Sequence, residues 1–180
     1  MVSLLALALS AAPADVAAAL AHIERDARVA LAADGSASRL RTLLEHYLDF
    51  HALAEYALDP EWSRLDRKKR ERFVSLLREV VVLQVEARIK RPVEFAVEVK
   101  RQQEAGDYVG VFAVLNPDAP DPIDLTLTLR ERDHWRVVDV SVDGSSLAKS
   151  YRDELLGLLT RAGFRAILKA LADKKKQLSR

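Results

Sequence analysis

The stretch IDLTLTLRERDHWRVVDVSV, residues 123–142, predicts two antiparallel strands joined by a short turn. Apolar and polar residues alternate over residues 123–130, and this period of two is typical of a strand with one buried face. Arg132-Asp133-His134 indicates the turn, and Trp135–Val142 forms the following strand. The stretch therefore predicts a hairpin whose apolar side chains gather on one side.

Two further strands precede this hairpin in the sequence. Residues 93–100 alternate in the same way, Ala105-Gly106-Asp107 is a turn signal, and Tyr108–Leu115 is mostly apolar. A loop with three prolines, residues 116–122, leads into the hairpin. Short connections between four such strands predict a curved four-stranded antiparallel meander with one apolar face.

Helical patterns lie on both sides of the meander. Apolar residues recur at the helical period in residues 15–33, 40–48, 50–58 and 65–90, and the last of these starts after a plausible cap, Asp66. Two more helices follow the strands, at residues 146–161 and 164–175, separated at Gly163. Helices, strands and helices in this order predict an α+β fold, with the helices on one face of the sheet.

Composition narrows the class of protein. The 180 residues suggest one domain, and 49% hydrophobic residues are typical of a folded globular chain. The net charge of +1, from 28 basic and 27 acidic residues, counts against a nucleic-acid binder. The absence of cysteine excludes disulfides and thiol catalysis.

The first residues resemble a secretory signal peptide. Residues 2–12 are mostly apolar, and Ala12-Pro13-Ala14 fits the small-x-small cleavage pattern, although no Lys or Arg precedes the apolar run. The other interpretation is a helix continuous with residues 15–33. The apolar run is shorter than the ~20 residues that a membrane-spanning helix needs.

No motif of a known catalytic site stands out. His46 and His51 are five residues apart, which misses the helical spacing of two metal ligands on one face. Asp139 and Asp143 share one face of a strand, but a turn and a structural hydrogen bond account for them better than acid–base catalysis. We expect no enzyme activity, no cofactor and no metal.

Charged residues near the helices have both structural and functional interpretations. Arg152, beside Tyr151, would pair with Asp139 or hold a phosphate, and the structural pairing is the better match. Two basic runs would be solvated helix ends or contacts for anionic groups. They consist of Arg64, Arg67, Lys68, Lys69, Arg70 and Arg72, and of Lys174, Lys175 and Lys176.

Several motifs along residues 40–176 together resemble the MlaC, or toluene-tolerance, family of periplasmic phospholipid-binding proteins, auxiliary components of an ABC transporter. The segment DFHALAEYAL, residues 49–58, followed by Trp62, is similar to the segment before the family's long helix, although Asp59-Pro60 departs from it. The strand–turn–helix signature is the more specific part. It comprises Trp135, Arg136, Asp139, Val140, Gly144, Ser146, Leu147, Tyr151 and Arg152, with Gly163, Leu168 and Leu171 after it.

The resemblance implies a cystatin-like outline with an apolar lipid pocket, in a single lipid-binding domain of residues 15–180 after a signal peptide of residues 1–14. It implies a periplasmic carrier that moves phospholipid between an outer-membrane lipoprotein complex and an inner-membrane ABC transporter complex, in support of outer-membrane lipid asymmetry. Its partners would be the phospholipid and, transiently, these membrane complexes, with no nucleic acid. The candidate lipid-binding residues are Phe73, Leu77, Val81, Phe95, Val97, Val111, Leu125, Leu127, Val138, Val140, Leu147 and Tyr151.

Three other functions remain compatible with the sequence. One is a carrier of another apolar lipid, such as a hopanoid precursor or a quinone-like molecule. Another is a small enzyme of cystatin-like shape that uses Asp139 or Asp143 as a base, and the third is a scaffold protein without a ligand.

Overall fold

The computed structural model describes residues 14–32, 37–88 and 96–179. The expected signal peptide, residues 1–14, therefore lies almost entirely outside the described residues, and Phe95 lies outside them too. The five helices are α1 (Ala14–Ala32), α2 (Ala37–Tyr47), α3 (Phe50–Leu58), α4 (Arg67–Arg88) and α5 (Leu147–Leu178), with a 3₁₀ turn, η1 (Glu61–Arg64). The strands are β1 (Val97–Ala105), β2 (Tyr108–Leu115), β3 (Ile123–Glu131), β4 (Trp135–Val142) and β5 (Ser145–Ser146).

The α+β class and the meander are confirmed, but the sheet has five strands rather than the four predicted. The strand order follows the sequence from β1 to β5, and each neighbouring pair is antiparallel. Asp143 and Gly144 take positive φ values of 48° and 76°, so the chain reverses at once and Ser145 and Ser146 pair with the end of β4. Two residues are too few to show an alternating pattern, which is why the sequence pattern did not reveal β5.

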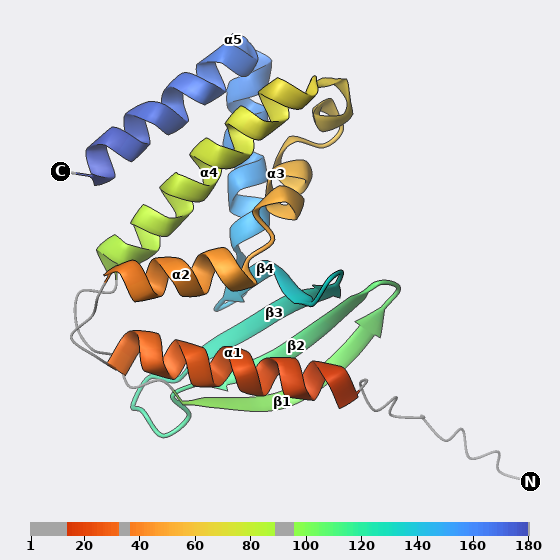
Figure 1. Ribbon diagram of the computed structural model, residues 1–180, viewed down its shortest axis with the longest axis vertical. Helices are drawn as coiled ribbons and strands as arrows, with labels where there is room; N and C mark the ends of the chain where they lie inside the picture. The colour runs from red at the N-terminus through yellow and green to blue at the C-terminus, as the bar shows by residue number, and fades with distance from the viewer. Residues whose placement is uncertain (1–13, 33–36, 89–95, 180) are drawn as a thin grey trace, which may run out of the picture.

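The buried apolar side chains form two separate clusters. The helical core lies between α3, α4 and α5 and contains Phe73 and Leu77, both fully buried. The sheet core lies between α1 and the sheet and contains Val16, Val111 and Leu129. Figure 1 shows the same division, with α1 across the sheet and α3, α4 and α5 in a separate layer. Leu48 contacts both clusters.

Asp49 joins the helical layer to the sheet. Its carboxylate caps α3 by accepting a 2.8 Å hydrogen bond from the Ala52 backbone amide, and it pairs with Arg130 and Arg132, each at 3.3 Å. Its backbone amide donates to the Val137 carbonyl of β4 at 2.9 Å. Asp49 is buried, so removal of its charge would leave Arg130 without an ionic partner in a poorly solvated place.

Gly163 divides α5 into two arms, as the sequence predicts. Its φ of 75° and ψ of 174° lie in a region that is almost exclusive to glycine. The chain turns back there, and Figure 1 shows the second arm of α5 running alongside α4. Residues far apart in the sequence are thereby brought to the same side of α4.

A hydrogen bond ties α1 to α2. The Tyr47 hydroxyl donates to the Asp26 carboxylate at 2.6 Å. This bond lowers the pKa of Asp26 below its ordinary value of 3.8. Burial, together with the same bond, raises the pKa of Tyr47 from 10.0 to about 12. The cover that α1 forms over the sheet is therefore anchored at its C-terminal half.

We expect Asp49→Ala to lower the free energy of unfolding by about 2–4 kcal/mol, because the change removes the cap of α3 and leaves the half-buried Arg130 without its ionic partner. Asp49→Asn keeps a cap acceptor and should lose less. Urea denaturation of both variants measures the effect, with the exposed Asp153→Ala as control. A midpoint for Asp49→Ala equal to that of the unmodified protein would contradict this role.

The Asp26–Tyr47 bond predicts a pH dependence of stability. A carboxylate with a lowered pKa stabilises the fold above 3.8, and this contribution is lost as the pH falls through the lowered pKa. A tyrosine with a raised pKa stabilises the fold below 10.0, and this is lost as the pH rises from 10.0 to about 12. Tyr47→Phe should therefore melt at a lower temperature than the unmodified protein near neutral pH, with the difference shrinking at both extremes. A difference that does not change with pH would refute the assignment.

Candidate functional site

One face of the sheet carries two rows of apolar side chains that cross the strands. Each row follows directly from the pairing register, because every member lies opposite the next one on the neighbouring strand. The first row is Val99, Ala113, Leu125 and Val142, and the second is Val111, Leu127 and Val140, with Gln102 at its β1 end. Val99 and Val142 are among the large apolar residues that stay exposed. The helices thus leave part of this face uncovered.

A pocket of about 280 Å³ lies between α1 and strands β1 to β3, and we call it the α1 pocket. Its only polar lining groups are Glu24 and Gln102, and the Gln102 side-chain oxygen is buried without a hydrogen-bond partner among the described residues. The apolar lining residues are Ala17, Leu20, Ala21, Ile23, Val97, Val99, Val111, Ala113, Leu125 and Leu127.

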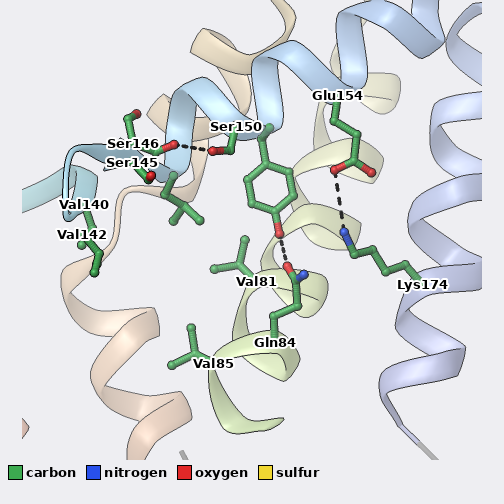
Figure 2. Close-up of a pocket in the computed structure, with 12 residues that line it drawn as sticks. Val81, Gln84, Val85, Val140, Val142, Ser145, Ser146, Ser150, Glu154 and Lys174 are labelled. Carbon is green, nitrogen blue, oxygen red and sulfur yellow. Dashed lines mark hydrogen bonds and ion pairs between the residues drawn. The ribbon is translucent and has the colours of Figure 1, made fainter. Parts of the chain in front are cut away.

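A second pocket, of about 440 Å³, lies between β4, β5, α4 and α5, and we call it the α5 pocket. Figure 2 shows Val81, Gln84 and Val85 of α4 facing the side chains from β4 and α5. Its volume falls in the range of ~300–1,000 Å³ that is usual for small-molecule sites. The lining residues are Val81, Gln84, Val85, Val140, Val142, Ser145, Ser146, Leu147, Ser150, Tyr151, Glu154 and Lys174.

The two pockets are neighbours on the same face of the sheet. Leu125 and Leu127 line the α1 pocket, and their partners across the β3–β4 boundary, Val142 and Val140, line the α5 pocket. We call the apolar surface that they share the trough. Its floor is apolar across four strands, which suits a long hydrocarbon group better than a polar metabolite.

Polar groups in the α5 pocket are engaged in structural hydrogen bonds. The Tyr151 hydroxyl donates to the Gln84 side-chain oxygen, and the Ser150 hydroxyl donates to the Ser146 carbonyl at 2.7 Å (Figure 2). Ser146 caps α5 by accepting from the Lys149 amide at 2.9 Å. These bonds position the wall of the pocket.

The two aspartates considered as bases, Asp139 and Asp143, accept structural hydrogen bonds. Asp139 accepts a hydrogen bond from the Ser146 hydroxyl at 2.7 Å and another from the Ala148 amide at 2.9 Å. Asp143 accepts from the Asp124 amide at 3.1 Å. The structural interpretation made from the sequence matches these contacts.

Arg152 does not pair with the strand, contrary to the expectation. It donates to the Tyr56 carbonyl at 2.6 Å and lies 3.7 Å from the Asp59 carboxylate. From the first turns of α5 this side chain reaches the end of α3, whereas Asp139 accepts from Ser146 and Ala148. Arg152 therefore braces α3 against α5.

The basic runs are partly neutralised by local ion pairs. At the start of α4, Arg67 pairs with Glu71 at 2.7 Å and Lys69 with Asp66 at 2.8 Å. At the end of α5, Lys175 lies 3.6 Å from Glu79. These contacts are those of solvated helix ends.

Eight of the twelve candidate residues line the two pockets. Phe73 and Leu77 are buried inside the helical core and line neither pocket. Val138 lies where the register between β3 and β4 shifts, and it also lines neither pocket. Phe95 lies outside the described residues. Val97, Val111, Leu125 and Leu127 line the α1 pocket, and Val81, Val140, Leu147 and Tyr151 line the α5 pocket.

Sequence reasoning missed the contribution of α1 and the charged pair of the α5 pocket. Leu20 and Ile23 belong to the helical pattern of residues 15–33, but nothing in that pattern indicates that these side chains cover the sheet. Glu154 and Lys174 belong to different arms of α5, and only the turn at Gly163 brings them together.

Within residues 14–32, 37–88 and 96–179, no helix is long and apolar enough to cross a membrane. The same ranges contain no group of three or more His, Cys, Asp or Glu side chains placed to hold a metal ion.

Comparison with known proteins places the fold. A phospholipid-binding protein from Ralstonia solanacearum, solved in complex with a phospholipid, superposes with a TM-score of 0.81 at 18% sequence identity, over 93% of this chain and 100% of that one. No curated protein matches the chain significantly in sequence.

The family assignment rests on the sequence as a whole. The family model described as MlaC protein matches residues 15–173, which includes every strand and nearly all of the helical residues. The chain belongs to the MlaC protein family.

Proposed function

We propose that the protein is a periplasmic carrier that holds the acyl chains of a phospholipid in the trough. The observation that carries this proposal is the apolar floor that continues from the α1 pocket to the α5 pocket through the β3–β4 pairs. Family membership and the fold shared with a phospholipid-bound protein support the same ligand class.

The energetic demand on such a carrier explains the apolar floor. Each methylene group left in water costs ~0.8 kcal/mol, so one long acyl chain costs on the order of 10 kcal/mol. The trough offers Leu125, Leu127 and Val140 as replacement contacts for this chain. The polar headgroup would stay at the surface, where water solvates it.

The proposed role in transport follows from this division of the ligand. A carrier that buries the tails and leaves the headgroup wet can take a lipid through water between two membranes. We propose that it exchanges phospholipid with an outer-membrane lipoprotein complex and an inner-membrane ABC transporter complex. Family membership supports this placement between the two membranes.

Binding rather than catalysis fits the chemistry of the pockets. Asp139 and Ser146 are hydrogen-bonded to each other and to the start of α5. Asp139 accepts from the Ser146 hydroxyl and the Ala148 amide, and Ser146 accepts from the Lys149 amide, so both side chains are used to fix the start of α5. The charged pair of the α5 pocket, Glu154 and Lys174, is better suited to binding than to proton transfer.

Leu127→Asp should abolish lipid binding, because it places a carboxylate in the middle of the trough floor. We expect at least a tenfold loss of co-purifying lipid, roughly the effect of one unpaired charge in an apolar site. The matched control is Thr126→Asp, which puts the same charge on the neighbouring residue of β3, on the opposite face. Equal lipid content in the two variants would refute the trough as the site.

The proposed function itself is tested with protein purified from the periplasm. Native mass spectrometry should show a complex with phospholipid, and the protein should transfer fluorescent phospholipid between donor and acceptor vesicles. A protein that carries no lipid and transfers none would contradict the proposal. Recovery of a hopanoid precursor or a quinone-like lipid instead would assign the trough to another apolar cargo.

A further inference from the structure

We propose that Glu154 and Lys174 form a headgroup subsite that selects zwitterionic phospholipids over anionic ones. This inference rests on the proposed function, since it names the headgroup of the lipid whose tails lie in the trough. Among the described residues that line the α5 pocket, these two alone carry a formal charge. The other described lining residues have apolar, hydroxyl or amide side chains.

The pair stands at the solvent side of the α5 pocket. Glu154 comes from the first arm of α5 and Lys174 from the second, and Figure 2 shows the two side chains directed towards each other. The Glu154 side chain is 62% exposed and that of Lys174 is 32% exposed. The apolar lining from Val81 to Val140 therefore leads to a polar rim that carries both signs of charge.

The two charges are close but weakly bound to each other. The Lys174 ammonium lies 3.8 Å from the Glu154 carboxylate and 5.9 Å from the centre of the Tyr151 ring. Exposed ion pairs at this separation contribute little to stability. A ligand that satisfies both charges can therefore replace the pair at small cost.

Neighbouring charges are engaged elsewhere and do not compete for the headgroup. Lys175 lies 3.6 Å from Glu79, Asp153 is paired with Lys149, and Arg152 is paired with Asp59. Tyr151, beneath Lys174, directs its hydroxyl to Gln84. Lys174 is thus the cation that faces the pocket, and Glu154 is the anion that faces it.

A headgroup with a phosphate and an ammonium matches this arrangement in both sign and order. The phosphate, which is nearer the acyl chains, would pair with Lys174, and the terminal ammonium would pair with Glu154. Phosphatidylglycerol would gain only the first contact, because its terminal glycerol is neutral and leaves Glu154 without a cationic partner in the ligand. A single unit-charge contact near 4 Å in water corresponds to about a fivefold difference in affinity.

The test is a competition between two headgroups with identical tails. The purified protein is incubated with vesicles of equimolar dioleoyl phosphatidylethanolamine and dioleoyl phosphatidylglycerol, re-isolated, and its lipid quantified by mass spectrometry. We expect phosphatidylethanolamine to be enriched about fivefold in the protein relative to the vesicles. Glu154→Gln should remove the enrichment, and Glu154→Lys should reverse it.

Asp153→Lys is the matched control. It makes the same charge change on the adjacent residue of α5, which does not line the pocket, and should keep the enrichment of the unmodified protein. Equal recovery of both lipids by the unmodified protein and by Glu154→Lys would overturn the headgroup subsite while leaving lipid binding intact. No recovered lipid in any form would overturn the proposed function itself.

Discussion

The apolar face of the sheet is larger than the helices that cover it, and the site depends on this mismatch. In a closed core, Val99, Val142 and the residues between them would be buried by a packed layer of helices. Here α1 crosses only part of the face, and the other helices build a core of their own (Figure 1). The uncovered apolar area costs free energy in water. A hydrocarbon ligand that covered this area would remove it from water, and the uncovered apolar surface therefore has the properties of a binding site.

The separation of the two cores is maintained by polar contacts rather than by close packing. Asp49 fixes the helical layer to β3 and β4 through its cap, its backbone bond and its two arginines. A buried ion pair of this kind defines position more than it adds stability. The α5 pocket lies between the two cores, since Val140 packs against the sheet core and Leu147 against the helical core. The contacts of Asp49 hold the two layers together beside this pocket.

The sequence predicted elements whose pattern is local and missed features that depend on packing. The alternation in residues 123–130 places Leu125 and Leu127 on one face, and the structure has them there. The same logic could not tell that Phe73 and Leu77 lie in the helical core, because residues of a closed core and of a pocket wall follow the same helical period. The partner predicted for Arg152 was wrong, because the closeness of the start of α5 to the end of α3 depends on tertiary packing and not on a local pattern. The α1 pocket could not be predicted without knowing which surface α1 covers.

Gly163 links the backbone to the charge distribution of the pocket. Glu154 and Lys174 are twenty residues apart, which would place them roughly 30 Å apart on a straight helix with a rise of 1.5 Å per residue. The conformation of Gly163 folds this distance to a contact of 3.8 Å. No side chain lies within 4 Å of a Cβ placed at Gly163, so the requirement for glycine there is one of backbone geometry and not of space. A single backbone conformation thus determines whether the rim of the α5 pocket carries two opposite charges.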